Sequence, residues 1–73
     1  MTLRQLDQKV ISFQTTTDTA VNAALAGNWD EAVDANRRAI MLFPQDVESH
    51  NRLGKALVEL GRLGEAKAAY GAS

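Results

Sequence analysis

A chain of 73 residues without cysteine can build at most one small domain, which neither a disulfide framework nor a thiolate metal site can support. Eight basic and nine acidic residues give a formal charge of −1, which argues against a nucleic-acid partner, because such partners usually require a basic stripe. The sequence has no apolar run long enough to span a membrane and does not start like a secretory signal, so we expect a cytoplasmic protein without membrane contact.

The first predicted helix covers residues 2–26. Thr2 and Gln5 have the spacing of a capping box, in which each side chain bonds the other residue's free backbone N–H. The threonines at 15–17 are β-branched and disfavour a helix, and Thr17 or Asp18 could cap a new one. The sequence therefore leaves open one long helix or a break near residues 14–18. Apolar or small residues alternate three and four apart along one face: Leu3, Leu6, Val10, Phe13, Thr17, Ala20 and Ala24.

A second helix is expected from Asn28 to about Leu42. Gly27 suits the left-handed conformation that ends a helix, and Asn28 with Glu31 resembles a capping pair. Pro44 cannot continue the helix and disfavours helical geometry at the preceding residue.

A third helix is predicted after Asp46, which can cap it, and a fourth begins near Leu63, after a second stop at Gly61. The fourth helix directs Ala66, Ala69 and Tyr70 inward. Helical spacing marks the buried stripe of the third helix as Val47, His50, Leu53, Gly54, Leu57 and Leu60.

Two stretches of the chain repeat each other 34 residues apart, because Gly27, Glu31 and Ala32 return as Gly61, Glu65 and Ala66. This period and the small residues at Ala20 and Gly54 resemble the tetratricopeptide repeat family, whose unit is a helix–turn–helix pair. The resemblance implies an all-α fold of antiparallel helix pairs stacked as a short α-solenoid with a long N-terminal helix. In that frame the single domain, 1–73, divides into an N-terminal helical extension (1–12), a first repeat (13–46) and a truncated second repeat (47–73).

The first repeat departs from the family pattern. Thr16 and Thr19 stand where bulky residues are preferred, and Asn36 occupies an aromatic position that Tyr70 fills in the second repeat. An alternative is that residues 13–22 are an insertion that lengthens an otherwise ordinary first helix by roughly 15 Å.

Catalysis finds little support in the sequence, and we expect a protein that is not an enzyme and has no cofactor or metal. The single histidine, His50, lies on an apolar stripe, where packing is the simpler explanation. No second histidine or cysteine stands near enough to suggest a metal site. Trp29 is interpreted as a packing residue, and the doublet Arg37 and Arg38 as part of the solvated surface.

The resemblance implies protein or peptide binding through a groove lined by the first helix of each pair. Asn51 and Lys55, one helical turn apart, are the best polar anchors. The family's Lys and Asn clamp for a terminal carboxylate is absent, because Thr17 and Val21 occupy those places in the first repeat. The groove candidates are Thr17, Val21, Ala24, Leu25, Asn51, Lys55, Val58 and Glu59.

Self-association is the alternative, because each repeat buries its apolar face only against neighbours and fewer than two repeats are present. If the chain is not part of a longer array, it would form a homo-oligomer through the apolar seam at Leu3, Leu6, Val10 and Phe13. An RNA-binding helical repeat is a third possibility, which the charge balance disfavours.

Overall fold

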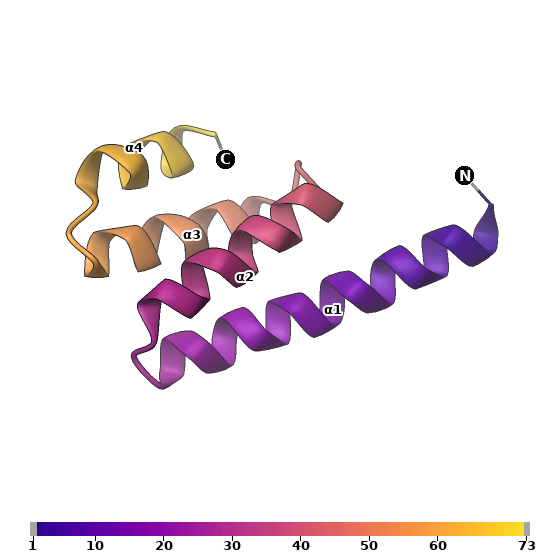
Figure 1. Ribbon diagram of the computed structural model, residues 1–73. Coiled ribbons are helices and arrows are strands. Elements are labelled where there is room, and N and C mark those ends of the chain that lie inside the picture. Colours follow the sequence, from indigo (N-terminus) through magenta and orange to yellow (C-terminus); the bar gives the residue numbers. More distant parts are fainter. Residues whose placement is uncertain (1, 73) are drawn as a thin grey trace.

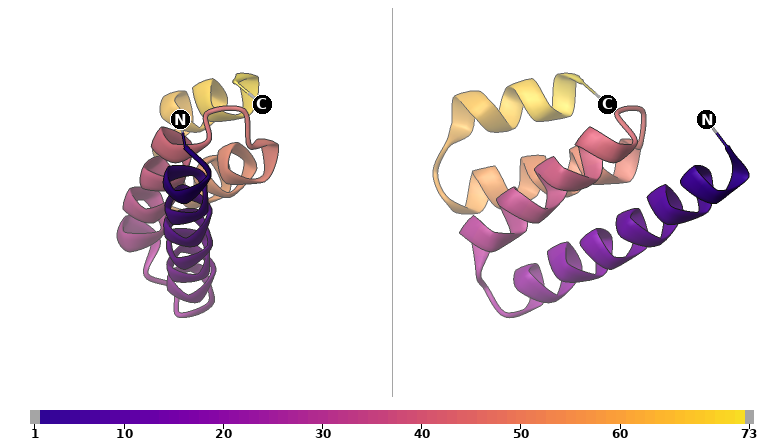
Figure 2. Two further views of the ribbon diagram at one scale, coloured as in Figure 1. Left: turned by 90° about the vertical axis from the view of Figure 1, so that its right-hand side faces the viewer. Right: turned by 45° about the vertical axis from the view of Figure 1, so that its right-hand side comes forward.

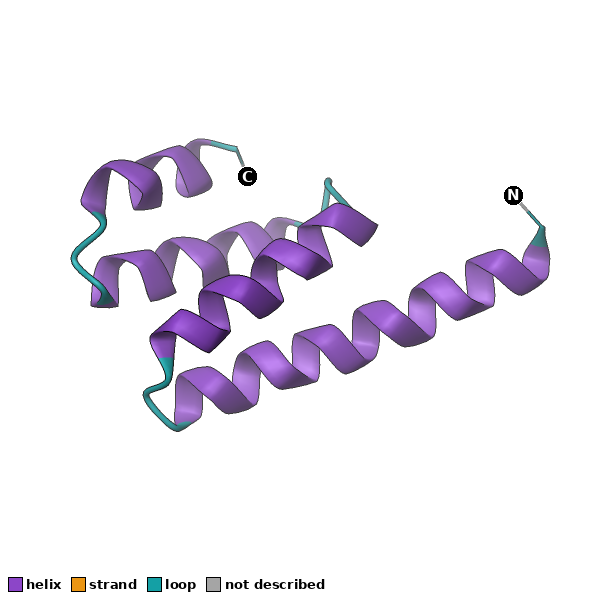
Figure 3. Cartoon of the chain, in the orientation of Figure 1, coloured by secondary structure: helices purple, strands orange, loops and turns teal. Residues whose placement is uncertain are grey.

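The computed structural model describes residues 2–72, which form four α-helices and contain no strand (Figures 1 and 3). The helices are α1 (Leu3–Leu25), α2 (Trp29–Leu42), α3 (Val47–Glu59) and α4 (Leu63–Gly71). The prediction of an all-α fold is confirmed. The outermost residues of the predicted domain, Met1 and Ser73, lie outside the described residues.

Consecutive helices run antiparallel, and each packs against the one before it, so that α2 lies between α1 and α3 and α3 lies between α2 and α4 (Figure 2). The Cα atoms extend over 41 × 26 × 13 Å. The shortest dimension is little more than the usual separation of about 8–10 Å between two packed helix axes. The arrangement is therefore compatible with a short solenoid, in which helices add side by side.

Helix α1 is continuous, which decides between one long helix and a break near residues 14–18. Its threonines are accommodated because their hydroxyls bond carbonyls one turn back: Thr16 Oγ1 donates to Ser12 O (2.7 Å) and Thr19 Oγ1 to Thr15 O (3.0 Å). The capping box also forms, since Thr2 Oγ1 accepts from Gln5 N at 3.2 Å and Gln5 Oε1 accepts from Thr2 N at 2.9 Å. The N-terminal half of α1 projects beyond the end of α2 (Figure 1).

The two turns inside the helix pairs have the same geometry. Gly27 and Gly61 adopt φ of 75° and 76°, a region that only glycine occupies at little cost. Asn28 N donates to Ala23 O and Arg62 N to Leu57 O, each at 2.8 Å. Together with the bonds donated by the glycine amides, these contacts form the Schellman motif at the ends of α1 and α3.

The core consists mainly of small side chains where the helices approach one another. The four small residues predicted at these approaches, Ala20, Ala32, Gly54 and Ala66, are all buried. Gly54 has a specific reason to lack a side chain, because a Cβ there would lie 2.6 Å from Cζ of Tyr70. Larger apolar residues of the core include Val33, Leu53 and Leu57.

One predicted core position needs correction, and a second is only partly covered. Val47 was expected on the buried stripe, but it is the first residue of α3 and its residue surface is 53% exposed. Ser49 is buried there instead. Tyr70 faces α3, as predicted, because its ring lies over the buried Gly54, but it remains 44% exposed.

Candidate protein-binding face

The predicted groove residues lie on α1 and α3, and four of them, Val21, Leu25, Val58 and Glu59, are near the C-terminal ends of these helices. Because α1, α2 and α3 alternate in direction, the C-terminal ends of α1 and α3 lie beside the N-terminal end of α2 (Figure 1). Here we define the binding face as Val21, Leu25, Asn51, Lys55, Val58 and Glu59.

The apolar part of this face is formed by Val21, Leu25 and Val58, which are all exposed. Leu25 is the most exposed, at 82%, and lies one residue before the C-cap of α1. Ala24 is half-buried and packs against the core instead. Isolated exposed apolar residues are common on protein surfaces. Three of them near the C-terminal ends of α1 and α3 offer a partner apolar surface that it can cover.

The charged part of the face is organised around Lys55. Its Nζ lies 3.5 Å from Glu59 Oε1, one helical turn away, and 5.8 Å from the centre of the Trp29 ring. Trp29 is half-buried and packs against the core, as predicted. Its ring therefore offers Lys55 a fixed neighbour on α2, within the range of a cation–π contact.

The two remaining candidates differ in what they offer. Asn51 is exposed on α3, one turn before Lys55, and its amide can reach a partner. Thr17 is half-buried, and its hydroxyl donates to Gln14 O at 3.0 Å. Thr17 consequently has less to contribute to binding than its position suggested.

Three hollows of the structure lie away from the binding face. A hollow of about 570 Å³ lies between α2, α3 and α4, with an apolar floor of Leu53, Leu57 and Ala69. Arg37 Nη2 and Glu65 Oε1, 3.2 Å apart, form an ion pair at its rim. A second hollow lies beside Val10 and Phe13, and a third lies between α1 and α2 beside Asn22 and Glu31. None of the binding-face residues lines any of the three hollows.

Glu65 also meets Arg62, whose Nη2 donates to Glu65 Oε1 at 2.8 Å. This hydrogen bond from Arg62 lowers the pKa of Glu65 and raises that of Arg62. Both side chains are solvated, so the pair is a surface contact at the start of α4 and does not form a reactive centre.

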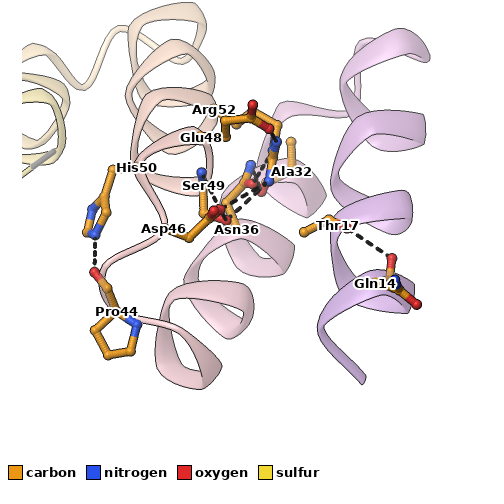
Figure 4. Close-up of polar contacts among 10 residues, drawn as sticks. All are labelled: Gln14, Thr17, Ala32, Asn36, Pro44, Asp46, Glu48, Ser49, His50 and Arg52. Carbon is orange, nitrogen blue, oxygen red and sulfur yellow. Dashed lines mark hydrogen bonds and ion pairs between the residues drawn. The ribbon is translucent and has the colours of Figure 1, made fainter. Parts of the chain in front are cut away.

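A polar network at the α2–α3 interface escaped the sequence analysis (Figure 4). Asn36 is only 1% exposed; its Nδ2 donates to Ala32 O at 2.9 Å and its Oδ1 accepts from Arg52 Nε at 3.1 Å. Arg52 also donates from Nη2 to Ser49 Oγ at 3.1 Å, and its Nη1 lies 3.6 Å from Glu48 Oε2. Asp46 completes the network by accepting from Ser49 Oγ at 2.6 Å while it caps α3.

The signal that could have revealed this network was the departure at Asn36. A buried amide without partners would cost about 1–3 kcal/mol, so an asparagine at an aromatic position implies a polar neighbour on the next helix. No buried side-chain nitrogen or oxygen in residues 2–72 lacks a hydrogen-bond partner. The network therefore holds α2 to α3 and is a structural feature.

His50 is likewise used for structure. The ring is half-buried, and its Nε2 donates to Pro44 O at 2.7 Å, which joins the start of α3 to the α2–α3 turn (Figure 4). No group of three or more His, Cys, Asp or Glu residues suited to a metal ion occurs within the described part of the chain.

The four self-association candidates lie on the projecting half of α1. Leu3, Leu6 and Val10 are exposed, with Leu3 reaching 82%. Phe13 is partly used within the chain, because its ring meets that of Phe43 edge to face with centroids 4.9 Å apart.

Comparison with known proteins does not assign the chain, since no family model, no curated protein and no solved structure matches it. Between residues 2 and 72, none of the helices combines the length and apolar character needed to cross a membrane.

Proposed function

We propose that this chain is a non-catalytic protein-interaction module of the tetratricopeptide type, which binds a protein or peptide through its binding face. The observation that carries the proposal is that Val21, Leu25 and Val58 are exposed near the C-terminal ends of α1 and α3, with the charged Lys55 on α3 and with α2 packed against both helices. The 34-residue sequence repeat supports the family assignment. The proposal includes a cytoplasmic location, which rests on the sequence alone.

The chemistry of the face favours a segment that brings apolar side chains next to an acidic group. Apolar side chains would cover Leu25 and Val58, because removing that surface from water is favourable. Lys55 carries three donors, and its contact with Glu59 at 3.5 Å leaves donors for an acidic partner group. Asn51 adds a donor and an acceptor one turn away.

The test uses peptides selected from a displayed random library against the immobilised chain. Lys55→Glu reverses the charge at the centre of the face and should weaken the selected peptides by about tenfold or more. Lys67→Glu is the matched control, because it makes the same charge change at an exposed position of α4. Equal affinity of both variants for the peptides would contradict the proposed face.

The apolar part is tested separately with Leu25→Asp. Leu25 is 82% exposed, so its replacement should leave the fold intact while it places a charge where the partner buries apolar surface. We expect a loss of binding with an unchanged circular dichroism spectrum. Binding that survives both Leu25→Asp and Lys55→Glu would place the partner elsewhere on the molecule.

A further inference from the structure

The projecting half of α1 carries a surface that the proposed binding face does not use. We propose that this half is a self-association element, along which two copies pair antiparallel through Leu3, Leu6, Val10 and Phe13. The partner is thus a second copy of this chain, and the two-fold axis crosses the seam midway between Leu6 and Val10, at the height of residue 8.

The spacing of the seam makes it self-complementary in one register. The seam of a heptad repeat consists of positions a and d. In an antiparallel pair, a residue at position a of one helix faces a residue at position d of the other helix. With residue 8 at the centre, Leu6 faces Val10 of the second copy, and Leu3 faces Phe13 of the second copy. This register uses all four seam residues, whereas a shift by one heptad leaves only part of the seam paired.

The structure provides a hollow at the position where this register places Leu3 of the second copy. About 440 Å³ of space lies beside α1, with Val10, Phe13 and Phe43 among its lining residues. The rings of Phe13 and Phe43 meet edge to face, and both residues line the hollow. A leucine side chain from the second copy fits a space of this size and apolar character.

Electrostatics of the helix ends favour the same direction. An antiparallel second α1 runs parallel to α2 and begins beside Phe43, where α2 ends (Figure 1). The positive N-terminal end of one helix then meets the negative C-terminal end of the other. No charged residue within either helix compensates these two ends, because α1 has no acidic residue in its first turn and α2 has no basic residue in its last.

Like charges on the flanks of the seam oppose the pairing, and Asp7 offers a diagnostic. Antiparallel helices place equivalent flanking positions on the same side, which brings Asp7 of each copy onto one flank. The same geometry brings Lys9 of each copy onto the other flank, where each Nζ lies 4.8 Å from the Phe43 ring of its own chain. Repulsion between the two Asp7 side chains should therefore weaken the dimer at low salt, and Asp7→Asn should strengthen it.

The first experiment measures mass by sedimentation equilibrium from about 10 μM to about 1 mM. The seam spans about three turns, so its area falls short of a standard interface, and we expect a dissociation constant on the order of 100 μM. Leu6→Glu should weaken the dimer by about tenfold or more, because it buries a charge twice in the symmetric interface.

Ile11→Glu and Gln8→Glu are the controls, since each adds the same charge to the exposed half of α1 outside the seam. Both should dimerise much more strongly than Leu6→Glu. A monomer throughout the concentration range, or equal effects of the three substitutions, would overturn the proposal.

The second experiment tests the direction of pairing and uses the absence of cysteine from the chain. We would mix Leu6→Cys with Val10→Cys under mild oxidation. Antiparallel pairing brings Leu6 and Val10 of different copies together, so disulfides should join the two variants. A parallel pair would instead join each variant to itself, and that result would overturn the proposed register.

Discussion

In the α1–α2 pair, Asn36 bonds Arg52 of α3, which belongs to the next pair. In the α3–α4 pair, the equivalent Tyr70 lays its ring over Gly54 of its own pair. The small residue at the equivalent position of the first helix also differs, because it is Ala20 in the first pair and Gly54 in the second. The turns between the helices are nevertheless the same, with φ of 75° at Gly27 and 76° at Gly61.

This difference teaches that one backbone plan can serve two tasks. In the first pair, the side chain at this position, Asn36, bonds the next pair. In the second pair, the side chain at the equivalent position, Tyr70, packs against the other helix of the same pair. Apolar volume differs as well, because Leu57 in the core of the second pair corresponds to Ala23 in the first. We therefore expect the first pair to depend on its neighbour more than the second does.

The largest effect should come from Leu57→Ala, which gives the second pair the small residue of the first. Leu57 is almost fully buried, so the substitution should lower the free energy of unfolding by about 2–5 kcal/mol through lost transfer energy and a cavity. Urea denaturation followed by circular dichroism measures it. Leu25→Ala, at an exposed position, is the control, and equal losses would show that Leu57 is not a core residue.

The link between the pairs is tested next, with Arg52→Met. This change keeps a long side chain but leaves Asn36 Oδ1 buried without its donor, which should cost about 1–3 kcal/mol. Arg38→Met removes a charge from an exposed position of α2 and should change stability little. If the two substitutions cost the same, the network does not hold α2 to α3.

The equivalence of the turns is examined with Gly27→Ala and Gly61→Ala. A Cβ would meet no atom within 4 Å at either site, so the cost should be the strain of the left-handed conformation alone, about 1–2 kcal/mol. We expect the two losses to agree within about 0.5 kcal/mol. A larger difference would mean that the turns are energetically distinct despite their shared geometry.

The smallest net effect is expected from Gly54→Ala, which gives the second pair the Ala20 of the first. The new Cβ would collide with the Tyr70 ring at 2.6 Å, but that ring is partly exposed and can swing outward. Alanine also gains about 1 kcal/mol over glycine within a helix, so the two effects should nearly cancel.

The ring resonances of Tyr70, the only tyrosine, report the movement by NMR. They should shift toward the values of a solvated ring. A loss above about 2 kcal/mol with unmoved resonances would show that the ring is locked in place.

The sequence alone determined the outer ends of the predicted helices. Capping residues, left-handed glycines and Pro44 act within a few residues of the chain, so the predicted range 2–26 differs by one residue at each end from α1, Leu3–Leu25. The end of α2 at Leu42 was likewise predicted correctly. The small residues at the helix approaches were also readable, because their 34-residue repetition exposes the packing pattern.

Only the tertiary structure decided what each helix face meets. Local signals could not tell whether α1 continues through its threonines, where Asn36 finds its donor, or that Val47 stays exposed at the start of α3. The same holds for the seam of α1, which α2 covers at Ala20 and leaves open at Leu3. Such outcomes depend on contacts between residues distant in the chain, and a periodic pattern shows that a face is apolar without showing what covers it.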